Sequence, residues 1–129
     1  MITRRNFLLA SAAAGAGLIG FGPPAFAASY SDSAFEAAQA AGKSIILEFH
    51  ADWCPTCRAQ SPAVRSVMSS KYDDFAIFTV NYDSQKSAVK KFGVRRQSTL
   101  IVFKGKSEKG RAVGITSESA IAKLMAKAA

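Results

Sequence analysis

The stretch SIILEFHADWCPTC, residues 44–57, contains both cysteines of the 129-residue chain and predicts a strand that runs directly into a helix. Its first half, SIILEFH, is a nearly continuous apolar run of strand length, which is typical of a strand covered on both faces. Residues 54–70 have a helical pattern, and Pro62 inside it removes one backbone hydrogen bond and is expected to bend the axis. Cys54 therefore comes at the start of a helix, with Cys57 one turn further along.

The rest of the sequence predicts that this unit belongs to one mixed sheet with helices on both sides. A short helix within residues 31–42 precedes the unit, and a second buried strand, FAIFTVNY, follows it. Residues 99–116 predict the two strands of a hairpin, with one helix before the hairpin and another after it. The resulting fold class is α/β, a three-layer α/β/α sandwich with a mixed central sheet of about four strands. The expected helix caps are Ser31 or Asp32, Asp83 and Ser117.

Residues 1–27 have the layout of an export signal rather than of a domain. Arg4 and Arg5 precede an apolar run at residues 7–21, and the sequence AFA, which ends at Ala27, has the small-x-small pattern of a cleavage site. The arginine pair followed by Asn-Phe-Leu resembles the twin-arginine signal of bacterial export. The run is shorter than the roughly 20 residues that span a bilayer, although an uncleaved anchor is the alternative. We expect cleavage after Ala27, a periplasmic location and no stable membrane span afterwards.

Residues 28–129 remain as one small domain with room for a single core. Fifteen of the seventeen basic residues and all nine acidic residues lie beyond Ala27, which gives this part a net charge of +6. Such basicity is typical of nucleic-acid binding in a cytosolic protein, but an exported protein does not normally meet nucleic acid. We therefore expect a solvated basic face and no nucleic-acid partner. We also expect the protein to be a monomer.

Three kinds of chemistry fit two cysteines at this spacing. A structural disulfide is common in exported proteins, but a bridge across two intervening residues removes little chain entropy and stabilises poorly. A redox pair fits better, because the helix N-terminus favours a thiolate at Cys54 and places Cys57 within reach of a mixed disulfide formed there. A metal site would need His50 and Asp52 as further ligands, and the alternation of side chains along a strand opposes this unless a dimer shares the site. No metal or other cofactor is expected beyond the Cys54–Cys57 pair itself.

The segments EFHADWCPTCR and VNYDSQKSAVKKFGVRRQSTLIVFKG, together with Pro62, resemble the active-site stretch and the second half of the thioredoxin superfamily. The chain also resembles the periplasmic thioredoxin-like domains that receive electrons from membrane thiol transporters. This resemblance implies a thioredoxin-like fold and a thiol-disulfide oxidoreductase that reduces disulfide-containing proteins, with Cys54 as nucleophile and Cys57 as resolving thiol. A membrane thiol transporter is one implied source of electrons. The family's usual first strand is not expected, since few residues separate Ala27 from the first helix.

Glu48 interrupts the apolar first strand, and because burial of an ionised carboxylate is costly, its pKa is expected to rise. The alternative is that its side chain reaches solvent at the end of the sheet. By resemblance, Glu48 matches the family's buried acid, which exchanges a proton with the resolving thiol, here Cys57. Thr79 stands where the family often has a lysine near this acid, which implies a different proton balance.

Four residues around the cysteines have less specific interpretations. Trp53 is expected to form an apolar shelf beside Cys54, although core packing would also explain a tryptophan. His50 is interpreted as a packing residue, with tuning of the Cys54 ionisation as the alternative. Pro55 and Thr56, between the cysteines, are expected to help set the reduction potential.

The sequence departs from the family at RRQSTL, residues 95–100, where Ser98 replaces a cis-proline that faces the disulfide. Because a cis bond before a non-proline residue costs about 2.5–4 kcal/mol, the Gln97–Ser98 bond is predicted to be trans and the loop reshaped. By resemblance, Gln97, Ser98 and Thr99 form the loop that binds an extended substrate segment. The family's proline also keeps metals from the thiols, so a metal- or iron–sulfur-binding carrier that uses the same cysteines is the alternative function.

Overall fold

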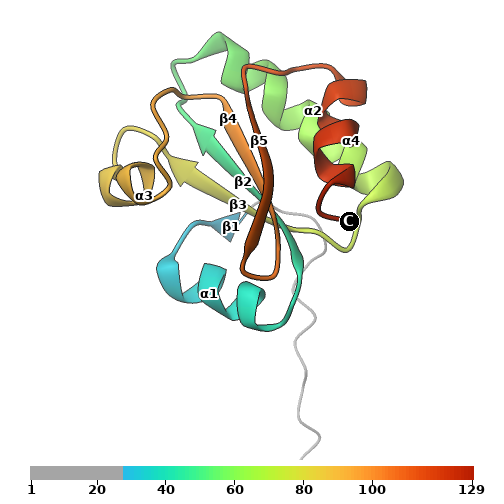
Figure 1. The fold of residues 1–129 in the computed structure, drawn as a ribbon. Helices are drawn as coiled ribbons and strands as arrows, with labels where there is room; N and C mark the ends of the chain where they lie inside the picture. The colour runs from blue at the N-terminus through green and yellow to red at the C-terminus, as the bar shows by residue number, and fades with distance from the viewer. Residues whose placement is uncertain (1–27) are drawn as a thin grey trace, which may run out of the picture.

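The structure, a computed structural model, describes residues 28–129, and the export signal predicted for residues 1–27 lies outside the described residues. This part of the chain folds as a three-layer α/β/α sandwich around one mixed sheet (Figure 1), which confirms the predicted fold class. In chain order the elements are β1 (Ala28–Ser29), α1 (Asp32–Ala40), β2 (Ser44–His50), α2 (Pro55–Lys71), β3 (Ala76–Asn81), α3 (Lys86–Lys91), β4 (Thr99–Lys104), β5 (Ser107–Val113) and α4 (Glu118–Ala126).

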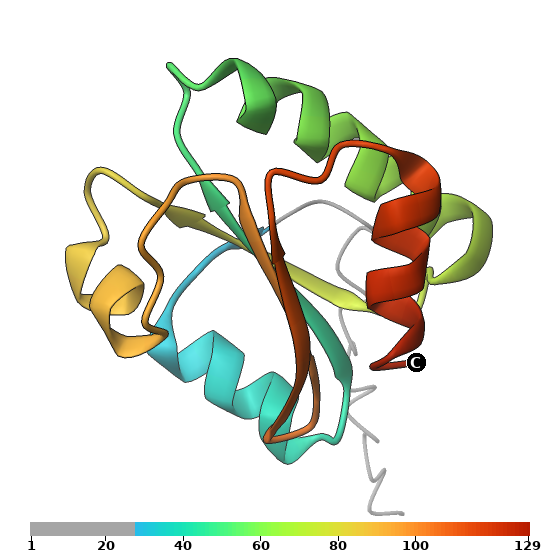
Figure 2. The same cartoon turned by 45° about the horizontal axis from the view of Figure 1, so that its top comes forward.

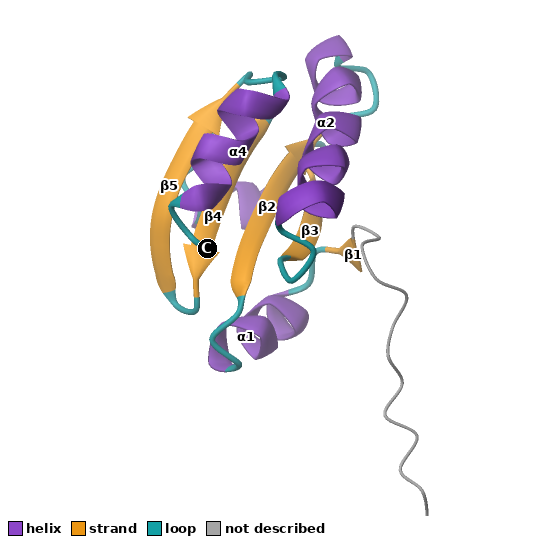
Figure 3. Cartoon of the chain, turned by 90° about the vertical axis from the view of Figure 1, so that its right-hand side faces the viewer, coloured by secondary structure: helices purple, strands orange, loops and turns teal. Residues whose placement is uncertain are grey.

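The sheet has the strand order β1-β3-β2-β4-β5 (Figure 3). β2 pairs in parallel with β3 and antiparallel with β4, and β5 pairs antiparallel with β4 as the predicted hairpin. The expectation of about four strands, with none before the first helix, is wrong by one strand: Ala28 and Ser29 pair in parallel with Phe78 and Thr79 of β3. Two residues are too few to show a strand pattern in a sequence, and their pairing depends on the free edge that β3 offers.

The central strand β2 is covered on both faces, as its apolar run predicts. Helices α1 and α3 lie on one side of the sheet, and α2 and α4 lie on the other (Figure 2). Ile45, Leu47 and Phe49 pack in the core on the α1 and α3 side, while Ile46 packs in the core on the α2 and α4 side. Since side chains alternate along a strand, Glu48 shares the α2 face with Ile46.

Two of the predicted helix caps are confirmed and one is wrong. The hydroxyls of Ser31 and Ser117 accept hydrogen bonds from backbone N–H groups in the first turns of α1 and α4. Asp83 does not cap the third helix, because α3 begins only at Lys86 and has no side-chain cap. The turn before α3 is held instead by the side-chain oxygen of Asn81, which accepts hydrogen bonds from the backbone N–H groups of Asp83 and Ser84.

Pro62, Gly42 and Gly93 occupy the helix and turn positions that the sequence predicts. Pro62 lies inside α2, so its position offers no N–H to the helix ladder. Gly42 and Gly93, which follow α1 and α3, have φ angles of 70° and 64°, a conformation that glycine adopts without steric cost. Within residues 28–129, none of the helices has the length and apolar character that crossing a bilayer requires.

Candidate active site

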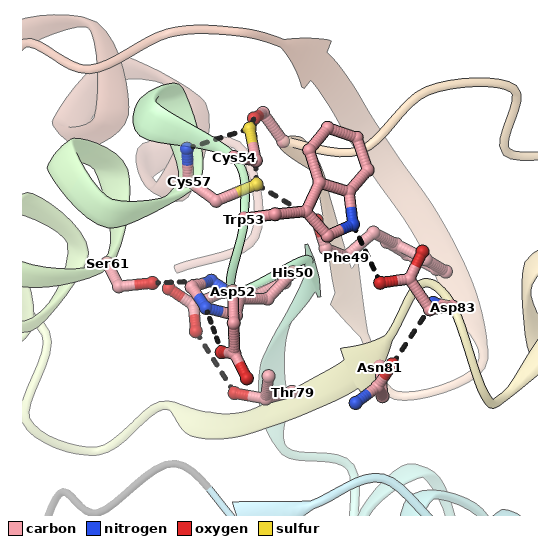
Figure 4. Close-up of polar contacts among 12 residues, drawn as sticks. Phe49, His50, Asp52, Trp53, Cys54, Cys57, Ser61, Thr79, Asn81 and Asp83 are labelled. Carbon is pink, nitrogen blue, oxygen red and sulfur yellow. Dashed lines mark hydrogen bonds and ion pairs between the residues drawn. The ribbon is translucent and has the colours of Figure 1, made fainter.

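Cys54 lies at the junction between the central strand and α2. It is the N-cap residue of α2, and Pro55 occupies the first helical position, where its missing N–H costs nothing. The Sγ atom of Cys54 accepts a hydrogen bond of 3.3 Å from the N–H of Cys57 (Figure 4). A helix N-terminus carries partial positive charge and unpaired N–H groups, so this position stabilises a thiolate.

The two thiols are unbonded, and they differ in acidity. Cys54 is 3% exposed and Cys57 is 1% exposed, so both residues are largely shielded from solvent. Burial opposes ionisation of Cys54, but hydrogen bonds from the Ser98 hydroxyl, from the N–H and thiol of Cys57 and from the N–H of Thr56 outweigh it and lower its pKa to about 7. Burial raises the pKa of Cys57, and the adjacent Cys54 raises it further. Cys54 therefore ionises first.

The hydroxyl of Ser98 lies between the two sulfurs. Its Oγ atom is 3.0 Å from the Sγ of Cys57 and 3.4 Å from the Sγ of Cys54. The Gln97–Ser98 bond is trans, as predicted, and Ser98 has a φ of 62°, the only positive φ of a non-glycine residue between positions 28 and 129. This left-handed conformation costs a residue with a Cβ atom roughly 1–2 kcal/mol, so the surrounding contacts hold Ser98 in place.

Three hydrogen bonds hold the backbone of Ser98. Its N–H donates to the carbonyl of Phe49 at 2.8 Å, and its own carbonyl accepts from the N–H of Gly114 at 2.9 Å. The side-chain amide of Gln60 donates to the same carbonyl at 3.0 Å and to the carbonyl of Ile115 at 2.9 Å. Gln60 was not predicted as a site residue, although a polar residue on the buried, otherwise apolar face of α2 is the pattern that could have revealed it.

The remaining members of the predicted substrate loop are placed next to Ser98. Thr99 is buried at the start of β4, and its hydroxyl donates to the carbonyl of Arg96 at 2.7 Å. Gln97 is half-buried in the turn that leads to Ser98. The loop is therefore braced from inside by Thr99 as well as by Gln60.

Glu48 is buried in the sheet rather than exposed at its end. Only 1% of the residue is exposed, and burial raises the pKa of its carboxyl group, although the charge of Arg65 and the hydrogen bond from Thr79 oppose the rise. The Thr79 hydroxyl donates to Oε2 at 3.1 Å, whereas Oε1 is buried without a hydrogen-bond partner. The raised pKa predicted from the sequence is confirmed, and Thr79 supplies a hydrogen bond at the place where the family often has a lysine.

His50 and Trp53 make contacts away from the sulfurs. The His50 ring lies between Asp52, with Nε2 3.1 Å from Oδ1, and the Ser61 hydroxyl, 3.3 Å from Nδ1 (Figure 4). Trp53 is 58% exposed, which rules out core packing as its role, and its indole N–H donates to the Asp83 carboxylate at 2.8 Å. Asp83, expected to cap a helix, instead orients this exposed indole.

The positions between and around the cysteines give no sign of a metal site. Pro55 and Thr56 are exposed in the first turn of α2, and the N–H of Thr56 is among the groups that lower the pKa of Cys54. Among residues 28–129, no three His, Cys, Asp or Glu side chains come together as metal ligands would. Asp52 and His50, the ligands that a metal site at the cysteines would need, contact each other instead.

A dithiol in which one member ionises near neutral pH, held where a central strand meets a helix, defines the site of a thiol-disulfide oxidoreductase. Comparisons with known proteins agree. The sequence model of the family described as Thioredoxin matches residues 26–127, and the chain belongs to this family. Members of the family are oxidoreductases of protein disulfides that need no cofactor, and the same holds for this chain.

Similar proteins come from both plants and bacteria. The chain is 32% identical to Thioredoxin H-type of Brassica campestris over 90 residues, which are 70% of this chain and 72% of the relative. The crystal structure of Trxlp from Edwardsiella tarda EIB202 has a TM-score of 0.74 and 38% identity, and the match covers 78% of this chain and 98% of that one. The thioredoxin NaTrxh of Nicotiana alata has a TM-score of 0.70 and 25% identity, and the match covers 83% and 96% of the two chains.

Proposed function

We propose that the protein reduces disulfides of other proteins in the periplasm, with Cys54 as the nucleophile and Cys57 as the resolving thiol. The Cys54 thiolate attacks one sulfur of the substrate disulfide, forms a mixed disulfide and releases the other sulfur as a thiolate. Cys57 then loses its proton and attacks the Sγ of Cys54, which closes the Cys54–Cys57 disulfide and releases the second substrate thiolate. The cysteine pair gives up two electrons, and the substrate disulfide receives them.

The observation that carries this proposal is the difference in acidity between two sulfurs only one helical turn apart. With a pKa of about 7, Cys54 is substantially ionised near neutral pH. Cys57 has a raised pKa and stays protonated until the mixed disulfide forms. An order of ionisation of this kind supports an order of attack, because only a thiolate is nucleophilic.

We assign Glu48 as the group that accepts the proton released by Cys57. A carboxylate with a raised pKa can accept a proton at neutral pH, and the unpaired Oε1 of Glu48 is free to do so. Thr79 holds the other oxygen, which fixes the direction of the carboxyl group. Glu48 lies on the face of the sheet that α2 covers, the helix that also carries Cys57.

The proposed location depends on residues 1–27. The arginine pair, the apolar run and the AFA sequence support export by the twin-arginine route, after which a membrane thiol transporter would return the enzyme to its reduced state. The test is cell fractionation of the full chain and of a variant with Arg4→Lys and Arg5→Lys. We expect the wild type in the periplasm and the variant retained in the cytoplasm, and equal distributions would contradict this route.

The proposed division of labour is tested by trapping. The reduced full chain with Cys57→Ala is mixed with a protein that contains an accessible disulfide, and non-reducing mass spectrometry is used to detect adducts. We expect a long-lived mixed disulfide on Cys54. The matched variant Cys54→Ala keeps a single buried thiol in the same site and should trap little. Equal trapping by both variants, or trapping by neither, would contradict the assignment.

A further inference from the structure

We propose that the Ser98 hydroxyl is a catalytic hydrogen-bond donor that serves the two sulfurs in turn. It first stabilises the Cys54 thiolate that attacks the substrate, and then the Cys57 thiolate that resolves the mixed disulfide. This inference deepens the proposed reductase function and depends on it. It assigns chemistry to the side chain that stands in place of the family's proline.

The position of the hydroxyl is the first support. Oγ lies 3.0 Å from the sulfur of Cys57 and 3.4 Å from that of Cys54, and Ser98 is only 3% exposed, so water does not compete freely for these contacts. A proline at this position would offer no hydroxyl, and it would also lose the N–H that donates to the Phe49 carbonyl. The backbone is held in a left-handed conformation that a serine does not adopt without support, which is typical of a functional position.

In the reduced enzyme, the protonation states of Cys54 and Cys57 determine which sulfur receives the hydrogen bond of the Ser98 hydroxyl. A serine hydroxyl donates one hydrogen bond and can also accept. When Cys54 is ionised and Cys57 is protonated, the short contacts form a chain in which the Cys57 S–H donates to Oγ at 3.0 Å and the Ser98 O–H donates to the Cys54 thiolate at 3.4 Å; the other acceptor near the Cys57 sulfur, the Phe49 carbonyl, is 3.9 Å away. Each group then has a partner, and the negative charge receives a charge-assisted bond.

Attack on the substrate reverses the direction of this chain. The Cys54 sulfur becomes part of a mixed disulfide, carries no negative charge and is then a weak acceptor. As Cys57 gives its proton to a base, its sulfur becomes the anion nearest to Oγ, and the Ser98 hydroxyl rotates to donate to it. Ser98 keeps its own proton throughout, so no net proton or electron is transferred to or from it.

The test compares Ser98→Ala with the wild-type full chain. Alanine keeps the Cβ atom and the same backbone demand, so only the hydroxyl is removed. The first readout is the rate of Cys54 alkylation by iodoacetamide from pH 5 to pH 9. Loss of one charge-assisted hydrogen bond should raise the apparent pKa of Cys54 by about one unit. Ser44→Ala, which removes a hydroxyl equally buried at the other end of β2, is the matched control.

The expected rate curves of wild type and variant cross. At pH 6 the variant has roughly tenfold less thiolate, but a less acidic thiolate is more nucleophilic, so the net rate should fall about threefold. At pH 9 Cys54 is ionised in both the wild type and the variant, and the variant should react about two- to threefold faster. The reduction potential should fall by about 30 mV at pH 9, which corresponds to the tenfold loss of stabilisation, and should hardly change at pH 6.

The second readout is the resolution step. Reduced enzyme is mixed with an aromatic disulfide that releases a coloured thiol, and the second release reports attack by Cys57. We expect this step to slow about threefold in Ser98→Ala near pH 7, because the same loss of a hydrogen bond raises the pKa of Cys57 while the remaining thiolate gains nucleophilicity. Ser44→Ala should match the wild type in both readouts.

Several outcomes would overturn the proposal. Superimposed curves, or a uniform change in rate at every pH, would show that the hydroxyl affects packing or access rather than ionisation. If Ser98→Ala does not fold, Ser98→Gly replaces it, because glycine tolerates a φ of 62° and also lacks the hydroxyl. Failure of both variants to fold would assign a structural role to the hydroxyl and contradict the proposal. If the wild type itself forms no mixed disulfide, the proposed function fails; if it does and the curves coincide, only the role of Ser98 fails.

Discussion

Replacing Glu48 by Gln should make the protein more stable at neutral pH, and the gain should depend on pH. The substitution keeps the shape of the side chain and removes its ability to ionise. Glu48 is 1% exposed and burial raises its pKa, so the folded state holds the carboxyl proton more tightly than the unfolded state does. Between the ordinary pKa of 4.5 and the raised folded value, the unfolded state releases this proton first, and stability falls as pH rises.

The size of the effect follows from linkage. Over this pH range the folded state binds one more proton than the unfolded state, on Glu48. The wild type therefore loses about 1.4 kcal/mol of unfolding free energy for each pH unit. A glutamine at position 48 loses none. The difference between variant and wild type should therefore be constant below the ordinary carboxyl pKa, rise with this slope above it, and level off at the folded pKa of Glu48. Contributions from Cys54 and other groups are common to both proteins and cancel in the difference.

The assay is urea unfolding of both reduced proteins at half-unit intervals from pH 4 to pH 8. A difference that is flat across this range would show that Glu48 titrates as an ordinary exposed carboxyl group. A difference that falls with pH would show that the charge of Arg65 outweighs burial, so that the anion is favoured in the folded state. Either result would refute the reasoning and remove the basis for Glu48 as a proton acceptor.

Three further predictions concern the surroundings of the thiols. Gln60→Ala leaves the carbonyls of Ser98 and Ile115 without their side-chain donor and should cost about 2 kcal/mol in urea unfolding; a loss below about 0.5 kcal/mol would contradict the bracing role. Ser98→Gly should be more stable than Ser98→Ala by about 1 kcal/mol, because glycine relieves the left-handed strain, and the opposite order would be inconsistent with the observed φ. Asp83→Ala should free the exposed indole of Trp53, seen as lower fluorescence anisotropy with a stability change under about 1 kcal/mol, and an unchanged anisotropy would show that this hydrogen bond does not hold the ring.

The parts of the fold that the sequence predicts are those encoded by local patterns. The apolar run before the cysteines predicts a central strand, and the interruption by Glu48 predicts a buried acid because every neighbouring position demands burial. The strand β1 escaped prediction, since a pair of residues carries no periodicity. An acidic residue before a helix usually predicts a cap, which is why the sequence favours Asp83 in that role. In the structure the Asn81 side chain accepts the hydrogen bonds of the turn, and the Asp83 carboxylate accepts one from the Trp53 indole instead.

The arrangement around the sulfurs depends on contacts that no local pattern encodes. The replacement of the family's cis-proline by Ser98, and the trans bond that follows, can be predicted from the sequence, because a cis bond is rarely found before any residue other than proline. The contacts of its hydroxyl with the two thiols appear only in three dimensions, because Ser98 is 44 positions from Cys54 and 41 positions from Cys57 in the sequence. Gln60 lies between these cases: its polar side chain on an apolar helix face hints at a buried partner, but the partner carbonyls come from distant loops.

The most direct measurement of the central claim is the pH dependence of alkylation at each cysteine in the reduced wild-type chain, with the modified sites identified by peptide mass spectrometry. We expect Cys54 to be modified first, with half-maximal reactivity near pH 7, while Cys57 remains unmodified until well above that pH. Equal modification of both residues, earlier modification of Cys57, or a Cys54 profile centred on the ordinary thiol value of 9.0 would contradict the claim that the helix N-terminus and Ser98 activate Cys54.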